Sequence, residues 1–120
     1  TAITYTLMLP MLPDEAAERM NLLLERDQLV VLRSVKHRAA PNGRAVVPVD
    51  LRLLITDLGP EPCTPDNWTA WRLRTCSREG RFAKAREILE LLGVDPAWCR
   101  VIRSRVDLAS EESEVEVLII

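Results

Sequence analysis

The stretch Trp68-Thr-Ala-Trp-Arg-Leu-Arg-Thr-Cys76 alternates two kinds of side chain along its length. Successive side chains of a strand point to opposite faces of a sheet, so this period of two predicts a strand with one buried and one exposed face. The buried set is Trp71, Leu73 and Thr75. The exposed set is Trp68, Arg72 and Arg74. An aromatic ring and two guanidinium groups, with no acid in the stretch, suit either an anion-binding surface or a solvated face.

The segments on either side of this stretch predict a mixed chain. Alternation and apolar runs indicate further strands at residues 3–9, 29–36, 44–58 and 98–108, with 49–58 as the best part of the third. Apolar spacing of three to four indicates helices at 14–24 and 81–92. The proline-rich residues 59–65 are expected to form a loop.

The order β-α-β-β-β-α-β predicts an α+β fold. Its natural packing is a two-layer, ferredoxin-like sandwich, with two helices on one face of a mostly antiparallel sheet. Residues 1–108 are expected to form a single domain. Residues 107–120 hold five acids and no base, so 109–120 is predicted to be an acidic C-terminal tail or an edge strand.

The composition agrees with one globular domain. The chain has 120 residues, of which 48% are hydrophobic and 28% are charged. No apolar run reaches the roughly 18 residues that a membrane-spanning helix needs, so no membrane partner is expected. Cys63, Cys76 and Cys99 are widely spaced and His37 is the single histidine, which argues against a zinc site or a disulfide framework. A cytoplasmic location without a cofactor is therefore predicted.

A basic surface is predicted on the sheet face away from the helices. Placing the more apolar set of each strand toward the helices leaves one aromatic ring and several arginines on the other face. These are Arg33, Arg52, Trp68, Arg72, Arg74, Arg103 and Arg105. Arginines neutralise phosphates, and a tryptophan offers a plane on which a base can stack. The alternative is an ordinary wet face, with Arg72 and Arg74 paired across strands to Asp50 or Asp107.

A second basic segment is Arg33-Ser-Val-Lys-His-Arg38, followed by Arg44, with no acid among them. Pro41-Asn-Gly43 is a turn signal, so the segment is expected to form a hairpin arm. Lys36 and Arg38 are then candidate phosphate contacts, and a solvated loop is the alternative. The chain has no H-E-x-x-H and no G-x-S-x-G, so we do not expect an enzyme.

Several short motifs resemble a known family. Residues 49–55, VDLRLLI, are similar to its V-D-I/L-R-P-L-I motif. Residues 73–80 are similar to its L-R-T-G-x-x-G motif, and 103–105 loosely to its R-x-R-T motif. Lys36 matches a lysine in the basic segment that comes before these motifs. Leu53 and Cys76 depart from the pattern, which tends to have proline and glycine there.

Over residues 3–108 the chain thus resembles the C-terminal half of an uncharacterised bacterial domain linked to radical-SAM proteins, fused to the enzyme or encoded beside it. The resemblance implies RNA-linked work and a radical-SAM partner. We therefore expect a non-catalytic accessory module that binds RNA, or an RNA-modifying radical-SAM protein, through its arginine-rich face. The alternative is a protein-interaction or structural subunit that uses its sheet edge and the strand at 114–120.

Overall fold

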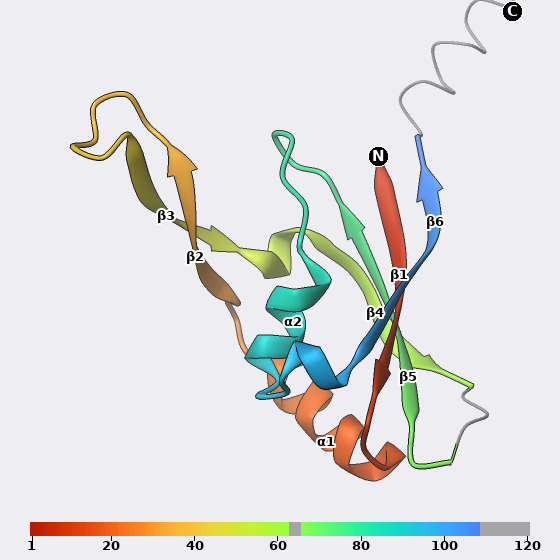
Figure 1. Cartoon of the computed structure of the whole chain (residues 1–120). Coiled ribbons are helices and arrows are strands. Elements are labelled where there is room, and N and C mark those ends of the chain that lie inside the picture. The colour runs from red at the N-terminus through yellow and green to blue at the C-terminus, as the bar shows by residue number, and fades with distance from the viewer. Residues whose placement is uncertain (63–65, 109–120) are drawn as a thin grey trace, which may run out of the picture.

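The computed structural model describes residues 1–62 and 66–108. These residues form six strands, two α-helices and two short 3-10 helices (Figure 1). In chain order the elements are β1 (Ala2–Leu9), α1 (Pro13–Leu24), β2 (Val30–Lys36), β3 (Arg44–Asp50), η1 (Leu51–Leu53), β4 (Ile55–Glu61), β5 (Thr69–Cys76), α2 (Ala85–Leu91), η2 (Pro96–Trp98) and β6 (Arg100–Asp107).

The strands divide between two sheets. Four of them form one sheet in the order β4-β5-β1-β6, and β2 pairs with β3 in a separate hairpin. All these pairings are antiparallel. The predicted α+β class and the antiparallel character are therefore confirmed. The expected count of five strands in one sheet is wrong, because the chain has six strands in two sheets.

The alternation of residues 68–76 is confirmed in β5, at the centre of the four-stranded sheet. Trp71, Leu73 and Thr75 are buried, while Arg72 and Arg74 are half-buried. In the antiparallel register, Trp71 lies opposite Leu7 and Leu73 lies opposite Tyr5, which aligns the apolar rows of the two central strands. One face of the sheet is therefore continuous with the core.

The two helices pack on that apolar row. Pro13 at the first helical position and acids in the first turn suit the start of α1. The buried side chains of α1 are Ala16, Met20 and Leu23, and those of α2 are Ala85, Ile88 and Leu89. They form one cluster with Leu7, Leu9, Trp71 and Leu73. Neither α1 nor α2 lies on the opposite face of the sheet (Figure 1).

The expected strand at 44–58 is interrupted by a turn, which accounts for the sixth strand. Asp50 begins η1, because its carboxylate accepts the backbone N–H of Arg52 at 3.1 Å. Leu51 and Leu54 are buried and Leu53 is 61% exposed. This spacing of three belongs to a helical turn and not to a strand. The predicted alternation across Asp50–Thr56 is therefore wrong.

Two other boundaries differ from the prediction. Residues 59–61, expected in a loop, belong to β4, which is an edge strand. Edge strands tolerate a proline such as Pro60, because its missing N–H can face away from the neighbouring strand. Helix α2 starts at Ala85 and not at residue 81, because Arg78 and Arg81 exchange two backbone hydrogen bonds of 2.9 Å in a tight turn around Gly80. Residues 109–120, the predicted tail or edge strand, lie outside the described residues.

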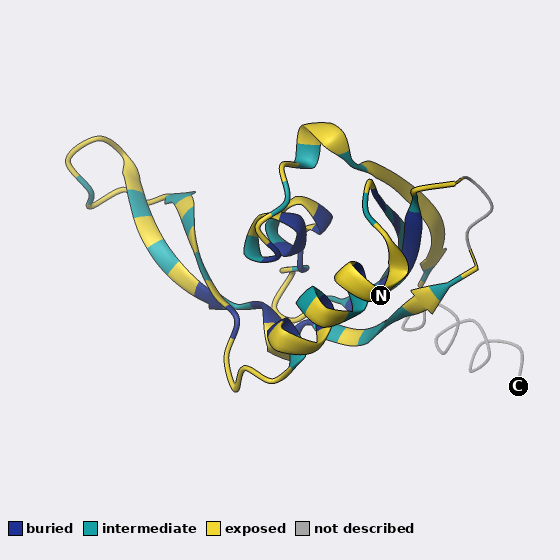
Figure 2. Ribbon diagram, turned by 90° about the horizontal axis from the view of Figure 1, so that it is seen from below, coloured by how far each residue is buried: buried dark blue, intermediate teal, exposed yellow. Residues whose placement is uncertain are grey.

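The β2–β3 hairpin projects from the body of the molecule, and we call residues 30–50 the arm (Figure 1). Its base is held by Leu29, Val49 and Leu51, which are all buried. The N–H of Leu51 donates to the carbonyl of Leu29 at 2.8 Å. Figure 2 shows that the chain changes from buried at this base to exposed toward the tip. Within the described ranges, no helix is long and apolar enough to cross a membrane.

Candidate nucleic-acid interface

The eight predicted site residues do not form one surface. The open sheet face is the row of Thr4, Thr6, Met8, Arg72 and Arg74, with the side chains beside it on β4 and β6. Trp68 and Arg105 belong to this face together with Arg72 and Arg74. The other four predicted residues lie elsewhere: Arg52, Arg103, Lys36 and Arg38.

A β-bulge separates Arg103 from Arg105. Arg105 lies opposite Thr4 and Arg103 opposite Tyr5, so Ser104 is an extra residue between two consecutive partners on β1. An extra residue reverses which face the following side chains occupy. Arg103 therefore lies on the helix side, where its guanidinium sits 5.9 Å from the centre of the Tyr5 ring. The prediction that both arginines share a face is wrong.

Arg52 closes the end of helix α1 instead of joining the open sheet face. Its guanidinium donates to the carbonyl of Leu24 at 2.8 Å. The last turn of α1 has no basic residue of its own, and the carbonyls of a helix C-terminus carry a partial negative charge. The predicted placement of Arg52 on the sheet face is wrong, because the chain turns at η1 and does not run through as a strand.

The arginines of the open sheet face are neutralised by acids of neighbouring strands. Arg72 forms a close ion pair with Asp57 and lies 3.9 Å from Glu61. The hydrogen bond and charge of Asp57 raise the pKa of Arg72 above its usual range. Arg74 lies 3.4 Å from Asp107. Pairing with Asp107 was one of the expected alternatives, whereas Asp50 lies at the arm base and pairs with neither arginine.

Trp68 and Arg105 also have partners within the protein. The guanidinium of Arg100 lies 5.4 Å from the centre of the Trp68 ring, a distance suited to a cation–π contact. Arg105 donates to Asp107 at 2.7 Å. The open sheet face is thus a network of internal pairs, and its groups are less available to a ligand than a row of unpaired arginines would be.

The tip of the arm has the opposite character. Its basic side chains and its histidine, Lys36, His37, Arg38 and Arg44, are all exposed. No acid occurs in the sequence between Asp27 and Asp50. No salt bridge joins these bases to an acid in the described part of the chain. The arm tip is therefore a cluster of positive charge held away from the body.

The register of the hairpin places two of these bases directly opposite each other. Lys36 on β2 faces Arg44 on β3, and like charges at such positions destabilise a sheet. Arg44 is turned toward the arm base, since its Nε donates to the hydroxyl of Ser34 at 2.8 Å. Lys36 and Arg44 thus belong to the same face of the hairpin, near its loop.

Backbone contacts shape the loop that joins the two strands. The N–H of His37 donates to the carbonyl of Gly43 at 2.9 Å, and Gly43 has a φ of 72° that favours glycine. The side chain of Asn42 accepts the N–H of Arg44 at 3.0 Å. The loop is thus organised by its own backbone, while the side chains of Lys36 and Arg38 extend into solvent.

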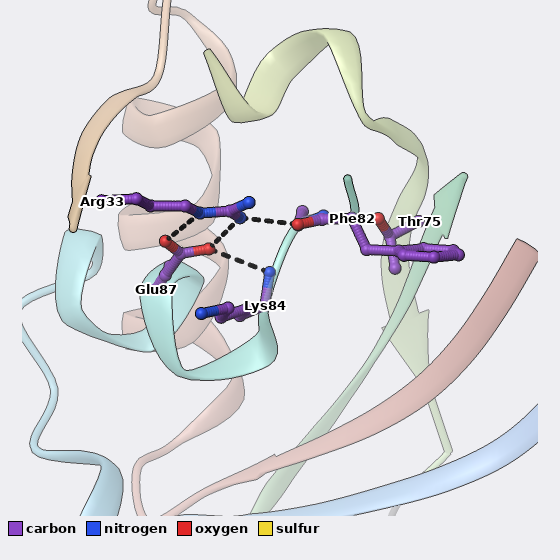
Figure 3. A network of polar contacts seen from close by, with 6 residues as sticks. Arg33, Thr75, Phe82, Lys84 and Glu87 are labelled. Carbon is purple, nitrogen blue, oxygen red and sulfur yellow. Dashed lines mark hydrogen bonds and ion pairs between the residues drawn. The ribbon is translucent and has the colours of Figure 1, made fainter. Parts of the chain in front are cut away.

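Arg33 anchors the arm to helix α2 (Figure 3). Its guanidinium donates to both carboxylate oxygens of Glu87, at 2.6 and 3.0 Å, and to the carbonyl of Phe82 at 2.6 Å. Burial alone would raise the pKa of Glu87, but hydrogen bonds from Arg33 and from the N–H of Lys84 outweigh burial and lower it. Arg33 is therefore a structural contact, and its expected place on the open sheet face is wrong.

Next to Phe82, the buried hydroxyl of Thr75 on β5 accepts the N–H of Ala83 at 2.9 Å. This bond ties the segment before α2 to the central sheet, so the surface that receives Arg33 is itself fixed (Figure 3). The arm is connected through α2 to the core.

A metal site is not formed by the described residues, among which no three His, Cys, Asp or Glu side chains are grouped. Cys76 and Cys99 are free and half-buried, and burial, with the charge of Asp95, raises the pKa of the Cys99 thiol. No protein-family model, curated protein or solved structure matches this chain.

The sequence prediction did not single out Arg44 as a site residue. The signal was present in the Pro41-Asn-Gly43 turn, because pairing the strands on either side of that turn brings Arg44 opposite Lys36. Recognising this pair requires knowledge of the register of the hairpin.

Proposed function

We propose that this protein is a non-catalytic recognition module that binds RNA through the tip of its arm, with Lys36, Arg38 and Arg44 as phosphate contacts. The observation that carries the proposal is the facing pair Lys36 and Arg44, two cations opposite each other with no acid nearby. A phosphate between them turns an unfavourable pair into two favourable contacts. Most of the affinity of proteins for nucleic acids comes from such phosphate contacts.

The shape of the arm supports the same function. Each strand of the arm has seven residues, which corresponds to a reach of about 23 Å at the usual rise of a strand. A two-stranded ribbon of this kind brings its charges to a polyanion without bringing the acidic parts of the body near it. The resemblance to the radical-SAM-linked family favours RNA as the polyanion and a radical-SAM protein as a partner.

In this proposal, the four-stranded unit is a ferredoxin-like platform and the arm is an insertion in it. The order β4-β5-β1-β6 supports this assignment. Strand β5 lies between β4 and β1, which helix α1 connects along the chain, and β1 lies between β5 and β6, which α2 connects. Two such split β-α-β units define the ferredoxin-like arrangement, with β2 and β3 placed between α1 and β4.

The test measures binding of the whole chain to single-stranded RNA of mixed sequence by fluorescence anisotropy, at low and moderate salt. The arm variant Lys36→Gln/Arg38→Gln is compared with the matched variant Arg100→Gln/Arg105→Gln, which removes two charges from the open sheet face. The arm variant should bind more weakly, with a salt slope reduced by about 0.7 for each lost phosphate contact. The sheet variant should bind like the original chain.

Two results would count against this proposal. Equal loss in both variants would assign the RNA to a surface that includes the sheet face. Binding to the original chain that is undetectable at low salt would remove RNA as the ligand altogether. Double-stranded DNA of the same length serves as a comparison. A protein that recognised only phosphates would bind both the RNA and the DNA.

A second candidate function is contact with a protein subunit, and the exposed apolar side chains of the arm favour it. Val30, Leu32 and Val46 lie on one side of the hairpin and are 46%, 71% and 65% exposed. Exposed apolar groups of this kind mark interaction surfaces when they are contiguous. Leu32→Ser/Val46→Ser would abolish such a contact and leave the RNA affinity unchanged.

A further inference from the structure

The segment between β5 and α2 forms a second basic hairpin. Arg78 and Arg81 pair across it in a single antiparallel bridge and exchange two backbone hydrogen bonds of 2.9 Å. Residues that face each other in an antiparallel pair lie on the same side of it. Figure 1 shows this segment projecting from the body on the same side as the arm. Two arginines are therefore held side by side near a projecting turn.

The turn itself has an unfavourable conformation for its sequence. Its two central residues, Glu79 and Gly80, have φ of 53° and 76°. Turns of this kind prefer Asn-Gly or Gly-Gly, and a glutamate in the left-handed region is uncommon. Like charges in facing positions also repel each other. A strained turn that sets two cations together is typical of a binding site and not of an ordinary solvated loop.

The two arginines border a groove at the base of the arm. The groove has a volume of about 410 Å³, and its other walls come from the end of β3, from Leu53 of η1 and from Leu54. Pro48 belongs to this wall and lies on the same exposed face of β3 as Arg44, because the two are four residues apart in a strand. That face therefore leads from the arm tip to the groove, over about 13 Å at the usual rise of a strand.

The acids that border the groove do not neutralise its arginines. Within the described ranges, no salt bridge joins Arg78 or Arg81 to an acid. Asp50 lines the groove, but its Oδ1 already accepts the backbone N–H groups of Leu29 and Arg52, at 2.9 and 3.1 Å. The remaining acid of the groove is the exposed Glu79 in the turn. Both guanidinium groups are thus available to an external anion.

We infer that Arg78 and Arg81 form a second phosphate site, and that a single strand of RNA runs from the arm tip along β3 into the groove beside them. The inference rests on the proposed function, because the arm tip makes the first contact with the RNA. A single strand suits this groove, since its phosphates can meet the arginine pair while its unpaired bases contact the apolar wall at Pro48 and Leu53.

The test uses the whole chain and single-stranded RNA of mixed sequence, about 16 nucleotides long, which is the upper end of known single-strand site sizes. Arg78→Gln/Arg81→Gln should weaken binding at least about tenfold at low salt, and reduce the salt slope by about 1.4, because two phosphate contacts are lost. The matched control Arg100→Gln/Arg105→Gln removes the same charge from the open sheet face and should bind like the original chain. Urea unfolding of each variant checks that the fold persists.

Failure of this inference and failure of the proposed function give different results. If the groove variant binds like the original chain while the arm variant Lys36→Gln/Arg38→Gln binds more weakly, the arm remains the RNA site and the groove site is overturned. If neither variant weakens binding, the proposed function fails as well. Equal loss in the groove variant and in the sheet control would reflect net charge alone and would also overturn the groove site.

Glu79 gives a second readout, of opposite sign. Glu79→Gln removes a negative charge from the turn that carries the arginine pair, so it should strengthen RNA binding about two- to fivefold at low salt, as expected for one exposed charge. The matched control is Glu90→Gln, which makes the same change of net charge on the exposed side of α2 and should have a smaller effect. Equal affinities of the two glutamine variants would contradict a phosphate beside the turn.

Discussion

At the scale of single residues, the facing of Lys36 and Arg44 sets this protein apart from an ordinary hairpin. Several arginines of the body pair with an acid, as Arg33 does with Glu87 and Arg72 with Asp57, whereas Arg44 has only the neutral acceptor Ser34. A side chain that breaks a local rule of stability is often retained for binding. The stability of the arm and its proposed function should therefore respond to substitution in opposite directions.

The variant Lys36→Glu is expected to stabilise the chain and weaken its binding to RNA. It replaces repulsion by attraction across the strands, worth roughly 0.5 kcal/mol, and it reverses one proposed phosphate contact. Urea unfolding and RNA anisotropy measure the two effects. Arg38→Glu is the matched control, because Arg38 lies in the loop and has no cross-strand partner. It should weaken binding without a gain in stability, and a gain of equal size would contradict the cross-strand cause.

Glu87 gives a prediction about pH. Its pKa in the folded chain lies below the ordinary value of 4.5, so the folded state holds the charged carboxylate more firmly than the unfolded state. This stabilisation is complete above pH 4.5 and is lost as the pH falls through the lower folded pKa. Glu87→Gln should cost about 2 kcal/mol at neutral pH, and the difference should shrink on acidification below pH 4.5.

The measurement for Glu87 is urea unfolding of the original chain and the variant at several pH values. Glu90→Gln is the control, since Glu90 pairs with Arg86 in an exposed i,i+4 arrangement and such pairs contribute little. A difference between original and Glu87→Gln that stays constant from neutral to acid pH would show that the carboxylate charge is not responsible.

At the scale of secondary-structure elements, the short helix η1 decides where the arm ends and the sheet begins. It turns the chain between β3 and β4, and it places Leu51 in the core at the junction while Leu53 is left outside. The bulge in the β1–β6 pairing has a comparable effect, because one extra residue moves Arg103 to the other face from Arg105. Each of these two features involves only a few residues, yet each moves an arginine away from the open sheet face: η1 moves Arg52 and the bulge moves Arg103.

Leu51 and Leu53 offer a direct test of this turn. Leu51→Ala should destabilise the chain by about 2 to 5 kcal/mol, the usual cost of a buried leucine. Leu53→Ala should change stability by less than about 0.5 kcal/mol, as surface substitutions generally do. A continuous strand would put both leucines on one face and make the two effects similar. The free energy of unfolding in urea distinguishes the two cases.

At the scale of the whole molecule, the arm tip and the body are separable. The body contains the hydrophobic core formed by the sheet and the helices. The hydrogen bonds Arg33–Glu87 and Leu29–Leu51 join the arm to this body near the base of the arm. The residues beyond Val35 and Ala45 are exposed apart from the half-buried Ala40. The tip therefore contributes little to the core, and its removal should leave the fold intact.

Replacing residues 36–44 by Asn-Gly makes this test. The pair Val35 and Ala45 would then be joined by a two-residue turn, for which Asn-Gly is well suited. The shortened chain should unfold at the same urea concentration to within experimental error and lose its RNA binding. Retained binding, measured by anisotropy at low salt, would place the RNA on the body and exclude the arm tip as its site.

Much of the local structure follows from residue order. The alternation in 68–76 and 3–9 predicted β5 and β1, the three-to-four spacing predicted α1, and the absence of acid near Lys36 predicted a basic arm. These features are readable because side-chain period and charge are properties of neighbours along the chain. The α+β class follows from the same periods.

The assignment of partners required the tertiary structure. Asp57 neutralises Arg72 from an adjacent strand 15 residues away, and Glu87 receives Arg33 from 54 residues away. The split into two sheets, the bulge at Ser104 and the facing of Lys36 and Arg44 depend on the same long-range registers. The sequence alone determined the strands β1 and β5, helix α1 and the basic character of the arm, where local periodicity and charge suffice. The tertiary structure decided which charges are neutralised, because pairing between strands is set by packing of the whole core and not by the order of neighbouring residues.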